Sequence, residues 1–391
     1  MKNLLLISII LFAFTSKLFS IDWRQISSGV TEDIYRMRFN DTKNGWILSD
    51  NFILKTDDAG ETWEKILTLS SFDLSTLSIV QNGKAWFAGK NGKILHFFNN
   101  DNENEFVEQK SGTDKYLLKS FFLNENLGWI VGFDGIIIKT TNGGAEWLTI
   151  REGEPGKHLF GIQFIDEMNG WAVGEQGTTL KTTDGGSTWQ RIITPAIYRN
   201  LNVNFSDREN GWISGFGFIV KTTNGGSSWN IQISTTVFII TDFMVIDKNR
   251  AWASFDKNSL LYTDDGGENW QYYQIPNDIE RLTFDVIGDD IIIAGSDGKI
   301  YKGKSTVSVN SKVYNDTKYI VKYSNDEIII NFNDDMNSIS NIEMFDLLGN
   351  QIFKFDYPFS NIIRINPFNY NLAKGIYFLK IGNNLKKIIL Q

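Results

Sequence analysis

The residues of this sequence best suited to bind a ligand occupy one position of a repeated pattern. Six times along the chain, a residue stands thirteen positions before a tryptophan that recurs every 40 to 43 residues. Its type varies between the repeats: Asp33, Asp73, Tyr116, His158, Arg199 and Ile239. Core positions of a repeat keep their type, whereas an asymmetric ligand site needs polar groups that differ between repeats; a solvated channel mouth is the other interpretation. The predicted ligand-binding residues, at this position and three residues further on, are Asp33, Arg36, Asp73, Tyr116, Lys119, His158 and Arg199.

Catalytic groups are scarce in the sequence. Its only histidines are His96 and His158 and it has no cysteine, which excludes a histidine metal cluster, thiol chemistry and disulfides. The glycine-rich turns lie between short strands, whereas a phosphate-binding loop precedes a helix. A formal net charge of −8 and a pI of about 5.0 give no electrostatic basis for nucleic-acid binding. We therefore predict no catalytic residue, no metal, no cofactor and no nucleic-acid partner.

An enzyme is the alternative to a binding protein. Glycoside hydrolases, including sialidase-like enzymes, need two carboxylates about 5 to 10 Å apart. Repeats of 40 to 43 residues leave no long insertions to build a deep cleft, and the arginine triad of sialidases has no recognisable counterpart. We favour a protein that binds a protein or glycan ligand and performs no chemistry. The carboxylates that could supply a catalytic pair are Asp33, Asp73, Asp134, Glu175 and Asp297.

The elements that must hold these residues are clearest in residues 169–189, NGWAVGEQGTTLKTTDGGSTW. WAV and TTLKTT are short strands of apolar and β-branched residues, joined by a tight turn from Gly174 to Gly177. In the turn that follows, an aspartate bonds backbone amides two residues on, and glycines accept positive φ. We predict that the turn carboxylates Asp57, Asp184 and Asp265 are structural; calcium binding there is the less favoured alternative.

The stretch recurs along the chain, so the protein is built from repeats. A seventh, degenerate copy at residues 281–304 supplies three strands, and residues 21–26 match the strand that it lacks. We predict an all-β fold, with a seven-bladed β-propeller over residues 21–304 that the N-terminal strand closes, because closure removes exposed sheet edges. The inner strand of each regular blade precedes the first tryptophan, found at Trp46, Trp86, Trp129, Trp171, Trp212 and Trp252.

The turn sequence resembles the Asp-box of BNR repeats, written roughly S/T-x-D-x-G-x-x-W. The copies GW(x)VG…DG…KTT(D/N)GG(x)xW at Gly128–Trp147, Gly170–Trp189 and Gly211–Trp229 make the propeller resemble the photosystem II stability/assembly factor-like family of seven-bladed BNR propellers. The resemblance covers residues 21–304. It implies the fold but names no ligand, because Asp-box propellers include both binding proteins and hydrolases.

The N-terminus predicts export from the cytoplasm. Lys2 is followed by an apolar run from Leu4 to Phe14, which is typical of a secretory signal peptide and too short to span a membrane. We predict a signal peptide over residues 1–20 and no transmembrane segment. Cleavage there leaves Trp23 in the mature protein.

The C-terminus predicts a second domain. Beyond Lys304 the repeat stops, and seven short alternating runs favour an Ig-like antiparallel β-sandwich over residues 305–391. Met344–Asn350, Leu372–Ile381 and Lys386–Gln391 resemble the type A C-terminal sorting domain of type IX secretion in Bacteroidetes-like bacteria. The resemblance implies type IX secretion machinery as a partner and, after the periplasm, the cell surface or the medium as the destination. A sandwich with no export role is the alternative.

Overall fold

The computed structural model describes residues 19–304, apart from 71–72, 81, 101–102 and 256–258, and seven strands between residues 319 and 390. The predicted signal peptide, except for its last two residues, lies outside the described residues. So do residues 346–350 and 372–374 of the sorting motifs. One compact unit contains residues 20–267 and 273–307, and a second contains residues 308–391.

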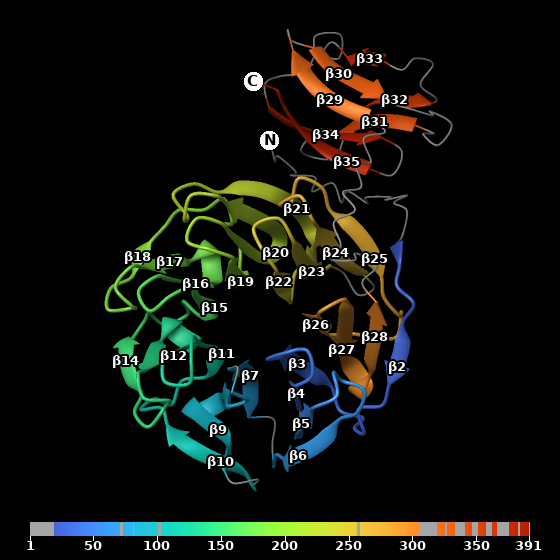
Figure 1. The fold of residues 1–391 in the computed structure, drawn as a ribbon. Coiled ribbons are helices and arrows are strands. Elements are labelled where there is room, and N and C mark those ends of the chain that lie inside the picture. Colours follow the sequence, from blue (N-terminus) through green and yellow to red (C-terminus); the bar gives the residue numbers. More distant parts are fainter. Residues whose placement is uncertain are drawn as a thin grey trace, which may run out of the picture. The chain divides into compact units, whose positions relative to one another are not determined.

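Seven antiparallel sheets surround a common axis in the first unit, with an inner strand of each sheet nearest the axis (Figure 1). The predicted seven-bladed propeller is thus confirmed. Blade one contains β3 (Ile34–Phe39), β4 (Gly45–Ser49), β5 (Phe52–Thr56) and β6 (Glu64–Thr68); blade two contains β7 (Leu74–Ile79), β8 (Ala85–Gly89), β9 (Lys93–Asn100) and β10 (Glu103–Lys110); blade three contains β11 (Leu117–Phe122), β12 (Gly128–Gly132), β13 (Ile137–Thr140) and β14 (Leu148–Arg151).

The remaining blades follow the same order with local differences. In blade five the second and third strands are continuous, as the single strand β20. Blade four contains β15 (Leu159–Phe164), β16 (Gly170–Gly174), β17 (Thr179–Thr182) and β18 (Gln190–Arg191); blade five contains β19 (Asn200–Phe205), β20 (Gly211–Thr222) and β21 (Asn230–Ile239); blade six contains β22 (Phe243–Val245), β23 (Ala251–Ser254), β24 (Ser259–Thr263) and β25 (Gln271–Gln274), bordered by β1 (Phe19–Ser20); blade seven contains β26 (Thr283–Ile287), β27 (Asp290–Ala294), β28 (Ile300–Lys304) and β2 (Arg24–Ile26).

Four blades turn between their second and third strands through a single 3-10 turn. In η3 (Glu175–Gly177), Gln176 and Gly177 both have positive φ, at 52° and 68°. Such a pair matches the right-handed twist of the two strands that it joins, which is why Asn-Gly and Asp-Gly recur at this place. The other three turns are η1 (Lys90–Gly92), η2 (Phe133–Gly135) and η4 (Ser296–Gly298).

The hydrophobic core lies between the blades. The first tryptophan of each of the six regular blades is at most 1% exposed, and in three of them it stacks on a phenylalanine at the end of the next blade's inner strand. Gly170, just before Trp171, lies directly against the ring of Phe164 in its own blade. It must be small, because a Cβ there would lie only 2.6 Å from that ring. The stacked pairs are Trp86 on Phe122 at 3.7 Å, and Trp129 on Phe164 and Trp171 on Phe205, both at 3.6 Å.

The Asp-box turn is satisfied from within. Oδ1 of Asp184 accepts hydrogen bonds from Thr182 Oγ1 at 2.7 Å and from the Thr188 amide at 2.9 Å, and Thr188 Oγ1 donates to Oδ2 at 2.6 Å. A lysine of the preceding blade then holds the turn, since Lys139 Nζ donates to the Gly185 carbonyl at 2.8 Å. The same lysine contact is made by Lys181 to Gly225, Lys221 to Gly266 and Lys302 to Ala59.

In blade one the turn carboxylate belongs to Asp58, and the prediction of Asp57 was wrong. Asp58 accepts the hydroxyl of Thr56 at 2.8 Å and both donors of Thr62, at 2.9 Å and 2.6 Å. The side chain of Asp57 is exposed to solvent. Two adjacent aspartates made both assignments possible, and only the residue two positions after the threonine faces back into the turn. Asp265 does occupy this position in blade six.

We expect Asp58→Ala to lower the free energy of unfolding by about 1–2 kcal/mol, because it removes three hydrogen bonds that order the turn. Asp57→Ala is the matched control and should be neutral. Burial alone would raise the pKa of Asp58, but the hydrogen bonds of Thr62 lower it below 3.8. The stabilisation that the ionised Asp58 carboxylate gives is therefore present above pH 3.8 and is lost as the pH falls further. Thermal unfolding of both variants across this pH range checks the prediction. Equal losses of stability in Asp58→Ala and Asp57→Ala would contradict the assignment of Asp58 to the turn.

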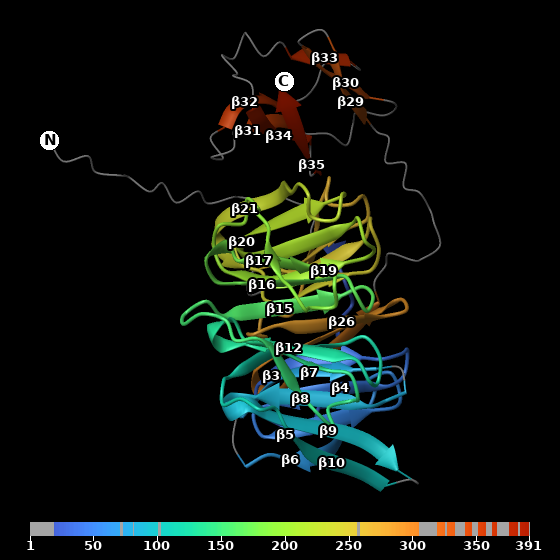
Figure 2. The same cartoon turned by 90° about the vertical axis from the view of Figure 1, so that its left-hand side faces the viewer.

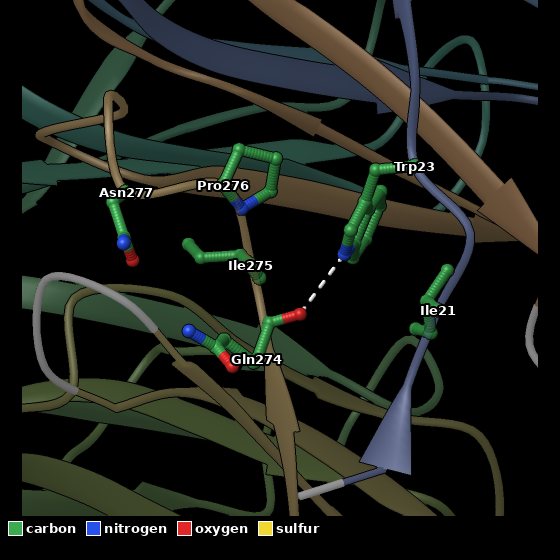
Figure 3. A pocket seen from close by; sticks show the side chains of 6 residues that line it. All are labelled: Ile21, Trp23, Gln274, Ile275, Pro276 and Asn277. Atoms are coloured by element: carbon green, nitrogen blue, oxygen red, sulfur yellow. Dashed lines mark hydrogen bonds between the residues drawn. The ribbon is translucent and has the colours of Figure 1, made fainter.

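Residues 20–26, which we call the N-terminal strap, link blades six and seven. Ile21 is 2% exposed and lies in the core that the two blades share. Trp23 Nε1 donates to the Gln274 carbonyl at 2.9 Å, beside a hollow of 240 Å³ that Pro276 also lines (Figure 3). β2 then pairs antiparallel with β28, with Ile26 opposite Ile300.

The second unit contains two sheets, which are seen apart from each other in Figure 2. Met344 pairs with Phe353 on one side and with Leu379 on the other, and the side chains of Met344 and Leu379 are fully buried. The three-stranded sheet contains β29 (Tyr319–Ser324), β30 (Glu327–Phe332) and β33 (Ile362–Ile365); the four-stranded sheet contains β31 (Asn341–Phe345), β32 (Gln351–Asp356), β34 (Gly375–Ile381) and β35 (Asn384–Leu390).

Candidate functional site

Five of the seven predicted site residues share one backbone contact at the start of an inner strand. The carbonyl of His158 accepts a hydrogen bond from the amide of Glu175 at 2.9 Å. Gly174 must be small, because a Cβ there would lie 2.0 Å from that carbonyl oxygen. This contact fixes the backbone and leaves the side chain free to vary, which explains the pattern in the sequence. The equivalent carbonyls are those of Asp33, Asp73, Tyr116 and Arg199, with amide donors at 3.2, 2.7, 2.8 and 3.1 Å.

Three of these side chains belong to a continuous arc across blades three to five, which we call the rim arc: Tyr116, Phe133, His158, Phe160, Arg199 and Phe216. The His158 ring stacks on Phe133, with centroids 4.2 Å apart, and its Nδ1 accepts the amide of Asp134 at 2.9 Å. Phe133 also contacts Tyr116 at 5.1 Å. The Arg199 guanidinium lies between two rings, 5.2 Å from the centroid of Phe160 and 5.1 Å from that of Phe216.

The rim arc borders a surface hollow and exposed apolar groups. A hollow of 440 Å³ is lined by Tyr116 and Phe133 together with charged residues that include Lys115 and Asp134. Phe133 is 37% exposed, and Ile197, two residues before Arg199, is 66% exposed. Aromatic residues and arginine are the residue types that carry most binding energy in protein interfaces. The arc therefore has the composition of a binding surface.

Asp33 and Asp73 lie outside the rim arc, each in an ion pair of its own. Asp33 pairs with Arg281 at 3.5 Å and accepts the amide of Asp297 at 3.1 Å. Asp73 pairs with Lys93 at 3.8 Å. Their assignment as ligand-binding residues stays a prediction.

Arg36 and Lys119 lie with Arg38 and Asp242 in a second group, which we call the axial cluster. Its members come from the inner strands of blades one and three and from the residue that precedes the inner strand of blade six. Both terminal nitrogens of Arg38 donate hydrogen bonds to the carboxylate of Asp242, at 2.7 Å and 3.2 Å. Nη1 also donates to the Phe284 carbonyl of blade seven at 3.1 Å. Charged side chains from well-separated blades thus meet near the axis of the ring.

Burial changes the proton affinities of these groups. Burial, reinforced by repulsion from Arg38 and Arg36, lowers the pKa of Lys119 to about 7. Burial alone would raise the pKa of Asp242, but its ion pair with Arg38 holds the value at about 2. Burial raises the pKa of the nearby Asp285 to about 6, against the attraction of Arg38. The cluster carries an excess of positive charge in an acidic protein.

Asp242 and Arg38 were missed by the sequence analysis. Counting thirteen residues back from Trp252 gave Ile239, which instead ends β21 and pairs with Phe216 in blade five. Arg36, Lys119 and Asp242 all stand ten residues before the first tryptophan of their blade. Applying that spacing to every blade would have found Asp242.

Within the part of the chain that the structure describes, no group of three histidine, aspartate or glutamate side chains could hold a metal ion. No described helix is long and apolar enough to cross a bilayer.

Two families match this sequence. The family described as Photosynthesis system II assembly factor YCF48 matches residues 15–110 and 152–235. The family described as Secretion system C-terminal sorting domain matches residues 324–391. The search of curated proteins found no match.

Solved structures of similar fold include two YCF48 proteins and one enzyme. YCF48 bound to D1 peptide is 20% identical, with a TM-score of 0.59 over 73% of this chain and 97% of that one. YCF48 from Cyanidioschyzon merolae is 18% identical, with a TM-score of 0.57 over 72% and 98%. Virginiamycin B lyase from Staphylococcus aureus is 15% identical, with a TM-score of 0.56 over 73% and 99%. The chain therefore combines a seven-bladed BNR propeller, similar to the photosystem II assembly factor family, with a type IX secretion C-terminal sorting domain.

Proposed function

We propose that this protein is an exported binding propeller that holds a protein or glycan ligand on the rim arc and performs no chemistry. The observation that carries the proposal is the unbroken run of aromatic, histidine and arginine contacts from Tyr116 to Phe216, beside a hollow of 440 Å³. A peptide is the favoured ligand, because a YCF48 protein of the same fold was solved with a bound peptide.

The ion pairs of the carboxylates support a role without catalysis. A glycoside hydrolase needs one carboxyl group kept protonated as a general acid. Asp134 is held by Lys115 at 2.7 Å, and this contact lowers the pKa of Asp134 below its ordinary value. Glu175 is held by Arg199 at 2.8 Å. The other carboxylates of the alternative, Asp33, Asp73 and Asp297, also face a cation, at 3.5, 3.8 and 3.3 Å.

The proposal includes the organisation of the chain. A signal peptide over residues 1–20 would start export, and the N-terminal strap would close the propeller of residues 21–304. An Ig-like sandwich over residues 305–391 would present the sorting signal to the type IX machinery. The destination is the cell surface or the medium after passage through the periplasm. The match of residues 324–391 to a sorting domain and the pairing of β2 with β28 support this organisation.

A ligand captured from a glycan array or from cross-linked secreted proteins should bind Phe133→Ala or Arg199→Ala at least about tenfold more weakly, since truncation of an interface hot spot costs about 2 kcal/mol or more. Leu148→Ala is the control, because Leu148 is exposed on the same blade as Phe133 and lies outside the arc. Calorimetric titration with the captured ligand measures the difference. Equal affinities for all three variants would place the ligand elsewhere.

A further inference from the structure

We propose that the axial cluster is a binding site for a single carboxylate group, held between the guanidinium of Arg36 and the ammonium of Lys119. This inference deepens the proposed function and rests on it, because it identifies a chemical group that the ligand carries.

Two donor groups of this site, Arg36 Nε and the Lys119 ammonium, have no acceptor among the described residues. Nη1 of Arg36 donates to the Tyr35 carbonyl at 3.0 Å. Its Nε is enclosed and, among the described residues, has no hydrogen-bond partner. Lys119 likewise has no ion-pair or hydrogen-bond partner within the described residues. An enclosed donor such as Arg36 Nε costs free energy when it is left unsatisfied, so an acceptor from outside the chain is expected to fill the place.

The charge of the surroundings selects a monoanion. Arg36, Arg38 and Lys119 bring three positive charges, and Asp242 cancels one of them through Arg38. Asp285 lies near Arg38 and cancels a second charge once it ionises, which happens near pH 6. Between about pH 6 and pH 7, where Lys119 keeps at least half of its charge, about one positive charge remains, which a carboxylate matches. A dianion such as sulfate would overcompensate it and be repelled by Asp242 and Asp285.

The shape of the free donors also suits a carboxylate. Because Nη1 of Arg36 is occupied, the side of the guanidinium that carries Nε is left for the ligand. A planar guanidinium edge and a carboxylate form paired, charge-assisted hydrogen bonds. Tyr116 of the rim arc immediately precedes β11, the inner strand that carries Lys119 of the axial cluster. A ligand on the rim arc could therefore reach the axial cluster with an acidic group.

The test uses the full-length chain and acetate as the probe, with chloride at equal ionic strength as the reference and sulfate, a dianion at both pH values used, as the competing anion. Thermal unfolding is followed by tryptophan fluorescence at about pH 6 and about pH 8. We expect acetate to raise the melting temperature, and to do so more at the lower pH, where Lys119 is charged. Sulfate also stabilises folded proteins non-specifically, so the comparison uses the part of each response that is lost in Lys119→Met, and this part should be smaller for sulfate than for acetate.

Two variants and a control separate a binding role from a structural one. Lys119→Met and Arg36→Met should lose the acetate response, while Lys248→Met, at an exposed lysine of blade six, should keep it. The lowered pKa of Lys119 means that the unfolded chain binds more protons above about pH 7, so the cost of burying the charge is fully present below pH 7 and disappears as the pH rises towards 10.5. Lys119→Met should therefore raise the melting temperature without acetate, most clearly at about pH 6.

An acetate response that survives in Lys119→Met would overturn the inference, and so would a sulfate response that falls more in this variant than the acetate response does. N-acetyl-trialanine with a free or an amidated C-terminus identifies the source of the group. Tighter binding of the free acid than of acetate indicates a chain end, and equal binding indicates a small organic acid. A wild-type protein that shows no acetate response but still captures a ligand on the rim arc would refute this inference alone and leave the proposed function standing.

Discussion

Deletion of residues 21–27 is expected to lower the melting temperature of the propeller by roughly 10 °C. The deletion removes Ile21 and Ile26, which are 2% and 5% exposed. Full burial of an isoleucine side chain contributes about 1.5–3 kcal/mol. The deletion also removes the strand that pairs with one side of β28, so that β28 becomes an exposed edge strand, which invites association with other chains. Tryptophan fluorescence measures the transition, and an unchanged melting curve would contradict closure by the N-terminal strap.

A double-mutant cycle makes this test specific. A Cβ on Gly303 would lie 2.1 Å from Ile21 Cγ2, 3.2 Å from the Asp22 carbonyl and 3.2 Å from the Trp23 ring, so the three nearest atoms all belong to the strap. Gly303→Ala should therefore destabilise the intact chain and have little effect in the chain without residues 21–27. An equal loss of stability from Gly303→Ala in both chains would show that the N-terminal strap does not lie against Gly303.

Removal of residues 372–391 is expected to block export while leaving the propeller folded. The truncation removes β34 and β35, which pair along their whole length, and with them the end of the sorting domain match. Immunoblots of cell fractions from the native host should find the truncated protein in the periplasm and its level at the surface or in the medium reduced to background. Truncated protein that reaches the outside at the wild-type level would refute the sorting role.

Tryptophan fluorescence is the folding control for this truncation. All 12 tryptophans lie between residues 23 and 270, so their fluorescence reports on the propeller alone. An unchanged melting temperature would show that retention results from the missing signal. A lowered one would mean that the propeller depends on the C-terminal domain, against the independence expected of separate domains.

The fold was predictable because the packing residues repeat. The first tryptophan of each regular blade occupies an equivalent place in the core between two blades, so the spacing of these tryptophans gives the number of blades. The axial cluster was harder to predict, because Arg38, Lys119 and Asp242 come from blades one, three and six and meet only through the curvature of the ring. Ile239 was misplaced because β21 of blade five extends through it, which shortens the connection to β22.

The stacking and lysine contacts between blades all run in one direction along the chain. Trp129 of blade three packs on Phe164 of blade four, and Lys139 of blade three holds the Asp-box turn of blade four. The same lysine contact joins blade seven to blade one. The ring is therefore equivalent to a cyclic oligomer with head-to-tail interfaces whose subunits happen to be linked. In such an assembly the break in the chain could lie in any blade, and circular permutants that begin elsewhere would keep every interface.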